Sequence, residues 1–296
     1  MIRRTLLILA LLSLFSCAND TRAVMLWKIE HSNLVKPSYL FGTYHSRDKE
    51  INALPVKVTQ VLASTQTVYT ETTIDKKSHA IIQGFMQASG LLPLKKRLSS
   101  STYKRLQQHI KRLNIPLSEH TLSVFKTWAI ALLLTNYADS KINPQELFMD
   151  ERLIKTAKAL STPSLGLETP KEQLIYFDVL TSWEQELLLI DSMNQTENEQ
   201  YAQALKKWYI KGDLNGFKEI QNTFKDKDPH IHALDNKLFR LLLTERNTRF
   251  LQRIHLILQN YPQDSYFFAV GAGHLAEENG LIALLRKKGY HINKVD

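Results

Sequence analysis

The amino-acid sequence predicts a mixed α/β (α+β) fold, in which N- and C-terminal strands form one central sheet and the middle region is mainly helical. Short, β-rich apolar runs lie near both ends of the 296-residue chain, at residues 26–43 and 266–270. Between about residues 99 and 260, apolar side chains recur every three to four positions, which is typical of amphipathic helices. Because the terminal runs are short, we expect them to be buried together in one sheet.

The first residues have the composition of a targeting segment. An arginine pair precedes the apolar run Leu6–Phe15, which is too short for an ordinary membrane span, and Cys17 follows it. The end of this run resembles a bacterial lipobox. We therefore expect Cys17 to be lipidated and to anchor the protein on the periplasmic side of the cell envelope, with the outer membrane favoured because Ala18 is not an aspartate. Ordinary signal cleavage near Ala18 or Ala23 is the alternative.

Composition limits the kinds of site that this chain can carry. The hydrophobic content of 44% is ordinary for a globular protein, and Cys17 is the only cysteine, which excludes an intrachain disulfide and a cysteine-based zinc site. The formal net charge is +9, but the lysines are spread along helices without an aromatic-basic motif, so we expect no nucleic-acid partner. We interpret residues 1–17 as a signal peptide and residues 24–296 as one domain, with a helical insert at about 99–260. The sequence carries no signal that predicts the oligomeric state.

The mature chain begins with a predicted hairpin of two strands, Leu26–Glu30 and Ser38–Thr43. A short helix follows at Val56–Ala63. The alternating run Thr67–Thr73 predicts a strand with Glu71 in its middle. A carboxylate inside a strand is costly to desolvate, so Glu71 is expected to be paired, to bind a metal ion or to face water.

The middle region predicts a series of helices and one short strand. The strand reads Ser-Leu-Gly-Leu-Glu-Thr and ends at Glu168, which places a second carboxylate at a strand end. The expected helices are interrupted by Gly212-Asp213 and by the charged run at 225–228. Their expected ranges are 150–160, 171–180, 182–193, 199–211 and 234–259.

Near the C-terminus, a buried-strand pattern at Tyr266–Val270 leads directly into a glycine-rich turn and a histidine. Gly271 and Gly273 allow a positive φ or a close approach to a ligand, and His274 follows them. A helix is expected at 281–288, with Gly289 as its end. In open α/β sheets, ligands bind at the carboxyl ends of strands, which is where this turn is expected to lie.

The same Gly-x-x-His spacing occurs at Gly42–His45, again after an apolar strand. With ten Gly and ten His in the chain, chance predicts about 0.3 such tetrads. If the two turns converge, His45 and His274 face the same region as Glu71 and Glu168. Two histidines with carboxylates suit a catalytic Zn, Mn, Co or Fe ion, which activates a bound water for hydrolysis. No nucleophilic Ser or Cys motif competes with this interpretation.

With these residues in place, the sequence resembles the TraB/PrgY/GumN family, which includes the Tiki metalloproteases. The matching segments follow one another along nearly the whole mature chain: FGTYH (41–45), VYTE (68–71), FKTW (125–128), MDERL (149–153), GLET (166–169) with Gln173, KWYIKGD (207–213), ERN (245–247), VGAGHL (270–275) and LLRKKGY (284–290). The resemblance implies an EreA/ChaN-like α/β fold and, in the Tiki branch, a divalent-metal-dependent protease.

Carried over to this sequence, the resemblance implies that His45, Glu71 and His274 bind a Mn, Co or Zn ion, with Glu168 as a ligand or base. Arg246 is then a substrate or oxyanion contact, Asn247 is its neighbour in the same motif, and Gly42, Gly271 and Gly273 shape the cofactor site. The expected function is an exported, metal-dependent hydrolase of peptides or small molecules. Two alternatives remain: a lipoprotein of the ChaN type that binds haem or a small molecule without turnover, and a metal-independent hydrolase like the erythromycin esterases.

One segment departs from the pattern of the family. After GAGHL many relatives continue with Pro-Gly, whereas this chain has Ala276–Gly280, with the sequence AEENG. We therefore expect the rim of the site to differ from that of the relatives.

Overall fold

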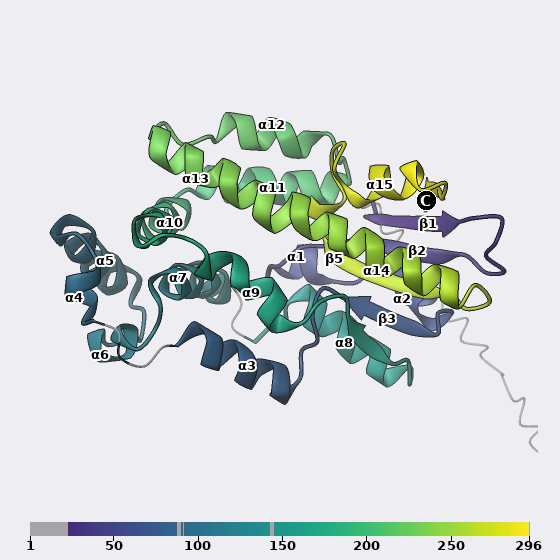
Figure 1. Ribbon diagram of the computed structural model, residues 1–296, viewed down its shortest axis with the longest axis horizontal. Helices are drawn as coiled ribbons and strands as arrows, with labels where there is room; N and C mark the ends of the chain where they lie inside the picture. Colours follow the sequence, from purple (N-terminus) through teal and green to yellow (C-terminus); the bar gives the residue numbers. More distant parts are fainter. Residues whose placement is uncertain (1–22, 88–89, 91, 143–144, 296) are drawn as a thin grey trace, which may run out of the picture.

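The computed structural model describes residues 23–87, 90, 92–142 and 145–295 (Figure 1). The predicted leader and Cys17 lie outside these described residues. Within them, no helix is both long and apolar enough to cross a membrane.

The centre of the fold is a six-stranded mixed sheet (Figure 1). Its spatial order is β4-β3-β5-β2-β1-β6, with parallel pairing from β4 to β2 and antiparallel pairing of β1 with both of its neighbours. This arrangement confirms the predicted fold class and the pairing of N- with C-terminal strands. The strands are β1 (Leu26–Glu30), β2 (Ser38–Thr43), β3 (Thr67–Thr70), β4 (Ser164–Gly166), β5 (Tyr266–Gly271) and β6 (His291–Lys294).

The register between β2 and β5 brings the two glycine-histidine turns to one edge of the sheet. Gly42 lies opposite Val270, and Thr43 lies opposite Gly271. Because the strands are parallel, both turns leave from their carboxyl ends. All five residues of β5 from Tyr266 to Val270 are buried, as expected of a strand covered on both faces.

Helices cover both faces of the sheet and form a separate layer beyond it (Figure 1). In Figure 1 α14 lies in front of β5, and α8 lies behind, in contact with β3 and β4. The helices are α1 (Lys49–Asn52), α2 (Val56–Ala63), α3 (Lys76–Met86), α4 (Leu94–Arg97), α5 (Ser100–Leu113), α6 (Glu119–Ser123), α7 (Thr127–Ile142), α8 (Met149–Ala159), α9 (Pro170–Asp178), α10 (Ser182–Gln195), α11 (Glu199–Lys211), α12 (Gly216–Thr223), α13 (Pro229–Phe239), the π-helix η1 (Arg240–Glu245), α14 (Arg246–Asn260), the 3-10 turn η2 (Ala272–His274) and α15 (Leu281–Lys287).

The buried apolar side chains form two clusters. One lies around the sheet and includes Phe41, Phe267 and Phe250. The other lies among the helices of the middle region and includes Trp128 and Leu189. Figure 1 shows the two parts side by side, with α9 and α13–α14 running from the helical part onto the sheet. The first residues of α9 and of α14 therefore lie at the carboxyl edge of the sheet.

Three expectations about the elements need correction. The strand predicted at Thr67–Thr73 ends at Thr70, so Glu71 follows the strand and is not in its middle. The helix predicted at 234–259 is the last part of a longer run that begins at Pro229 and contains the π-helix η1. The helical middle region also begins earlier than residue 99, with α3 at Lys76.

Candidate functional site

The carboxyl ends of three parallel strands place three of the candidate residues. Glu71 follows β3, Glu168 comes two residues after β4, and His274 ends the 3-10 turn after β5. Beyond the strands, the ladder continues through a hydrogen bond from Glu168 N to Glu71 O of 2.8 Å. The Glu71 side chain turns back to β5, where Oε1 accepts a hydrogen bond of 2.7 Å from the Gly271 amide.

The Arg246 side chain reaches Glu71 and Glu168 from α14, which packs on the sheet. Arg246 is the first residue of α14, and its side chain is only 7% exposed. Its Nε and Nη2 donate to Glu168 Oε1 at 3.0 and 2.6 Å, and Nη2 also pairs with Glu71 Oε2. The guanidinium therefore lies between the two carboxylates, in the geometry that charge-assisted hydrogen bonds favour.

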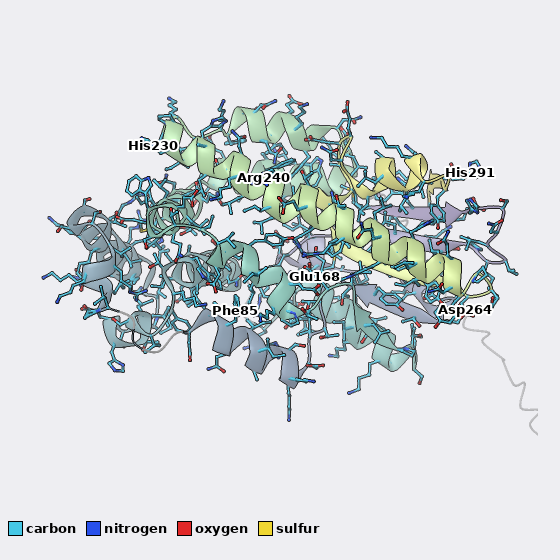
Figure 2. All side chains as sticks on the ribbon, in the orientation of Figure 1. Phe85, Glu168, His230, Arg240, Asp264 and His291 are labelled. Atoms are coloured by element: carbon cyan, nitrogen blue, oxygen red, sulfur yellow. The ribbon has the colours of Figure 1, made fainter. Side chains whose placement is uncertain are left out.

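A π-helical segment precedes Arg246 directly. Figure 2 labels Arg240, where this segment begins, and Glu168 beside α14. Arg246 Nη1 donates back to the Leu242 carbonyl of the segment at 3.2 Å. Because a π segment has more residues per turn than an α-helix, it changes the register in which later side chains face the sheet. Such segments are frequent at functional sites.

His274 completes a buried cluster with these charged groups. Its residue exposure is 3%, its Nδ1 lies 2.6 Å from Asn247 Oδ1, and its Nε2 lies 3.1 Å from Arg246 Nη1. The same Nε2 is 3.6 Å from Glu71 Oε1. We refer to Glu71, Glu168, Arg246 and His274 as the buried cluster.

The members of the buried cluster perturb each other's protonation. Burial alone would raise the pKa of the Glu71 carboxyl, but Arg246, His274 and the Gly271 amide outweigh burial and hold that pKa at about 2. Burial lowers the pKa of His274 to about 4, with Glu71 and Arg246 acting in opposite directions. At neutral pH, Glu71 is therefore ionised and His274 is uncharged.

Glu168 is the most enclosed of the four side chains. Its side chain is inaccessible to solvent, and its Oε2 also accepts a hydrogen bond of 3.0 Å from Arg249 Nη2. Burial raises the pKa of Glu168, with the Arg246 charge opposing it and the Glu71 charge adding to it. Burial also opposes the charge on Arg246, but the two carboxylates outweigh it and raise the pKa of the guanidinium.

The structure brings Glu71, Glu168, Arg246 and His274 together, and it does not bring His45 into contact with them. His45 is exposed, and its ring stacks on Phe148, with centroids 3.8 Å apart and an angle of 11° between the planes. The two turns are neighbours, as expected, because β2 and β5 are adjacent. Among the described side chains, however, no hydrogen bond or ion pair links His45 to the buried cluster.

The three glycines that we expected to shape a cofactor site have φ angles outside the left-handed region. A Cβ on Gly42 would lie 2.8 Å from Leu275 Cδ1 and 3.2 Å from Ala272 Cα, so Gly42 allows the two turns to pack closely. A Cβ on Gly273 would lie 3.3 Å from the Phe217 ring. The observed reason for glycine at Gly42 and Gly273 is close packing. Of the two possibilities considered for Gly271 and Gly273, a positive φ is not the one observed.

The donor groups give a test of the expected metal site. Glu71 and His274 lie close enough to share an ion, but Glu71 Oε2 and His274 Nε2 already bind Arg246, and Glu71 Oε1 accepts from the Gly271 amide. The third expected ligand, His45, lies on Phe148. Within the described part of the chain, no group of three or more His, Cys, Asp or Glu side chains is arranged to hold a metal ion. In this arrangement the residues therefore do not fit a three-ligand metal site, because a guanidinium takes the place of the cation.

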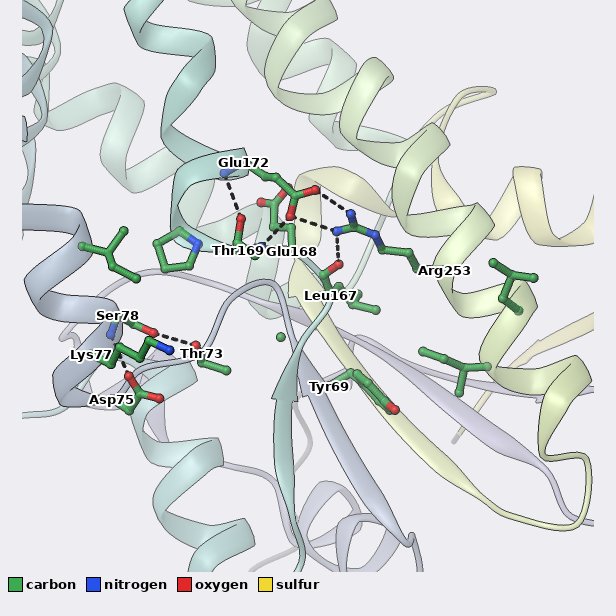
Figure 3. Close-up of a pocket in the computed structure, with 15 residues that line it drawn as sticks. Tyr69, Thr73, Asp75, Lys77, Ser78, Leu167, Glu168, Thr169, Glu172 and Arg253 are labelled. Atoms are coloured by element: carbon green, nitrogen blue, oxygen red, sulfur yellow. Dashed lines mark hydrogen bonds and ion pairs between the residues drawn. The ribbon is translucent and has the colours of Figure 1, made fainter. Parts of the chain in front are cut away.

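Figure 3 shows an open pocket of about 730 Å³ next to the buried cluster. Its lining comes from α3, the start of α9, α14 and the ends of β3 and β4, and it includes Glu168, Thr169 and Tyr69. Glu172 and Arg253 pair at 2.6 Å on its wall (Figure 3). Because the Glu168 side chain is inaccessible, the pocket meets this residue through its main chain, and the carboxylate faces the cluster.

Sequence reasoning gave no role to two residues that contact the cluster. Gln173 Nε2 donates to Glu71 Oε2 at 3.3 Å, and Arg249 pairs with Glu168. A signal for Arg249 was present, because Arg246, Arg249 and Arg253 recur at the spacing of one helix face. A signal for Gln173 was also present, because it stands with GLET among the segments that match the family, although we gave it no role.

Comparisons with known proteins agree with the motifs. The chain matches the model of the TraB/PrgY/gumN family over residues 25–294. It is 22% identical to a protein named metalloprotease TIKI homolog from Nematostella vectensis, over 91% of this chain and 66% of that protein. It is 23% identical to metalloprotease TIKI2 from Danio rerio, over 90% of this chain and 60% of that protein.

A bacterial relative has a more similar length. The protein named uncharacterized protein YbaP from Escherichia coli (strain K12) is 23% identical over 84% of this chain and 87% of its own length. The chain thus spans less than two thirds of the TIKI proteins named above, and most of YbaP. No solved structure matches it. The match over nearly all of the described residues confirms the resemblance seen in the motifs: the chain belongs to the TraB/PrgY/gumN family.

Proposed function

We propose that this chain is a hydrolase of peptide-like substrates and that its reaction takes place at the buried cluster. The observation that carries the proposal is the burial of two carboxylates, a guanidinium and an imidazole at the carboxyl edge of the sheet. Removing such charges from water is costly, and apolar residues of similar volume are often equally stabilising. Buried charged groups with strongly shifted pKa values are typical of active sites.

The family supports the reaction class. Several relatives are named metalloproteases, which favours amide hydrolysis over binding without turnover. In our proposal, the substrate is therefore a peptide or a compound with a peptide-like amide bond. Because the donor atoms of Glu71 and His274 bind Arg246 here, the proposed steps use only side chains of this chain.

The roles follow from which groups donate, which accept and which reach solvent. Glu71 is ionised and has the most exposed side chain of the cluster, at 18%, so it is assigned to orient the attacking water. His274 is neutral, and its Nε2 accepts a hydrogen bond from Arg246 Nη1 in the free protein. When that N–H turns to the substrate carbonyl, Nε2 takes a proton from the water as the water oxygen attacks the carbonyl carbon. Arg246 stabilises the resulting oxyanion. The proton on Nε2 then passes to the leaving nitrogen as the carbon–nitrogen bond breaks.

His45 has a separate place in the proposal. It follows the strand beside β5 and is the exposed imidazole of the two Gly-x-x-His turns. We assign it to contact the substrate at the rim, with Phe148 as the surface against which its ring packs. Replacement of His45 is therefore expected to raise KM more than it lowers kcat.

The test uses residues 24–296 and a panel of internally quenched peptides. Glu71→Gln and His274→Ala are expected to lower kcat/KM by at least about 100-fold, the lower end of the range for loss of a group that acts in proton transfer. Glu172→Gln is the matched control, because Glu172 also pairs with an arginine of α14 but lies outside the cluster. Full activity in both cluster variants would overturn the proposal.

We also propose that the protein is exported and anchored through Cys17, which the lipobox-like leader supports. Expression of the full chain in a bacterium with labelled palmitate should label the wild type and not Cys17→Ala. Equal labelling of the two proteins would contradict the anchor and would leave the proposed reaction unaffected.

A further inference from the structure

We propose that Asn247 is a positioning residue that fixes the tautomer of His274, holding the proton on Nδ1 and the lone pair on Nε2. The inference rests on the proposed function for its consequence in catalysis, but the tautomer itself is a property of the folded chain. Asn247 is 2% exposed, and the oxygen and nitrogen of its side-chain amide face different partners. Its Oδ1 lies 2.6 Å from His274 Nδ1, and its Nδ2 donates to the Asn279 carbonyl at 2.8 Å.

The first argument starts from the Asn279 end. A carbonyl oxygen only accepts hydrogen bonds, so the side-chain NH2 of Asn247 must face Asn279. The amide oxygen of Asn247 must then face His274. Because that oxygen has no proton to donate, Nδ1 of His274 must carry the proton.

The second argument starts from the other end and is independent of the first. A guanidinium only donates, so Nε2 of His274 must accept from Arg246 Nη1 across 3.1 Å. A neutral imidazole has one donor and one acceptor nitrogen. The hydrogen bond to Asn279 and the hydrogen bond from Arg246 therefore require the same tautomer of His274.

The opposite tautomer is excluded on energetic grounds. It would place Nε2–H against a guanidinium N–H and would leave Nδ1 and Asn247 Oδ1, both acceptors, facing each other. Both residues are buried, so water cannot easily relieve these contacts. Each unsatisfied buried polar group costs about 1–3 kcal/mol.

Asn247 also links the imidazole to the Ala276–Gly280 loop, the segment in which we expected this chain to differ from its relatives. Asn279 belongs to the Ala276–Gly280 loop, where Glu277 has a left-handed φ of 67°. A Cβ on Gly280 would lie 2.1 Å from the Ala276 carbonyl oxygen, so the loop needs glycine there. The conformation of this loop thus sets the orientation of Asn247, and through it the reacting nitrogen of His274.

The test is 15N NMR of residues 24–296 labelled at histidine, with His274 identified by its absence in His274→Ala. In the wild type, Nδ1 should give a protonated, pyrrole-like signal and Nε2 an unprotonated, pyridine-like signal. Asn247→Leu removes the acceptor at similar volume and should shift both signals. It should lower kcat by about 10–100-fold with little change in KM, the range found when a residue that orients a functional histidine is lost.

Thr248→Ala is the matched control, because Thr248 is the next residue of α14 and is exposed. Should Asn247→Leu fail to fold, Asn247→Asp decides, since it keeps an acceptor for Nδ1 and should retain the pyrrole-like Nδ1 signal. A wild-type His274 protonated at Nε2, or unchanged signals in a folded Asn247→Leu, would overturn the inference. A confirmed tautomer with full activity in His274→Ala would instead overturn the proposed function alone.

Discussion

Replacing Arg246 with methionine should destabilise the protein strongly, because it removes the cation that separates two buried carboxylates. The methionine side chain occupies similar space but leaves Glu71 and Glu168 without their shared partner. Breaking a buried ion pair by removing one member costs about 3–5 kcal/mol. We expect the lower end of this range, since Glu168 keeps Arg249 at 3.0 Å and Glu71 keeps the Gly271 amide at 2.7 Å.

The loss should depend on pH in a defined direction. In the wild type, the pKa of Glu71 is about 2, below its ordinary value of 4.5, so its contribution is complete above pH 4.5 and is lost as the pH falls towards 2. Without Arg246, the pKa of both carboxyls rises, and protonation relieves the unpaired charge. The difference in unfolding free energy between wild type and variant should therefore be largest near pH 7 and smaller near pH 4.5.

Urea unfolding followed by tryptophan fluorescence at these two pH values measures the difference. Arg253→Met is the control, because Arg253 lies on the same helix but pairs with Glu172 where both side chains are about one third exposed, at 36% and 32%. Such a pair contributes less than about 1 kcal/mol. Equal losses in the two variants, or a loss at Arg246 that does not change with pH, would refute the reasoning.

Three further predictions concern the same site. The pKa of His274 is about 4, below its ordinary 6.5, so the unfolded chain binds this proton at a higher pH than the folded chain. The free energy of unfolding should therefore fall by about 3 kcal/mol between pH 6.5 and 4. The plot of unfolding free energy against pH for His274→Gln should lack this fall. Gel-filtered wild type should retain substoichiometric Mn, Co or Zn by elemental analysis, because two donors face Arg246, and one tightly held ion per chain would contradict the observed arrangement. Gly42→Ala should lower the unfolding free energy by about 1–3 kcal/mol, since the new Cβ meets Leu275 and Ala272, and an unchanged urea midpoint would show that this packing adapts.

The sequence predicted the centre of the fold because the central strands have strong local signals. The strand β5 is continuously apolar, and β2 is followed by a matching Gly-x-x-His turn, so their pairing could be inferred before the structure was known. The edges had weaker signals. The strand β6 has one buried residue, Ile292, among exposed neighbours, and β4 has three residues, which is too few for a period to be seen.

The structure brings together four of the five candidate catalytic residues, in an arrangement that the sequence did not predict. The Gly-x-x-His spacing pointed to His274, and a carboxylate within a β-rich run pointed to Glu71, but the alternating run through Thr73 placed Glu71 inside a strand. The strand pairing stops at Thr70, and the Glu71 carboxylate binds the Gly271 amide of the neighbouring strand end. Contacts of this kind join residues 200 positions apart, so local propensity carries no information about them.

The largest difference between expectation and structure concerns the cation at the centre of the site. The imidazoles of His45 and His274 and the Glu71 carboxylate were expected to bind a metal ion, with Glu168 as a ligand or base. In this structure a guanidinium from α14 binds Glu71, Glu168 and His274 instead. The two cations place different demands on the protein, because a metal ion needs donors that converge on a point, while a guanidinium offers five N–H groups in a plane. Arg246 directs these groups to Glu71, Glu168, His274 and the Leu242 carbonyl, so the carbonyl of a substrate must compete for them. It follows that tight binding of Arg246 in the free protein opposes its role towards the oxyanion. Glu168→Gln removes the charge of one partner while keeping an acceptor oxygen, so it should separate the contribution of Arg246 to stability from its contribution to kcat.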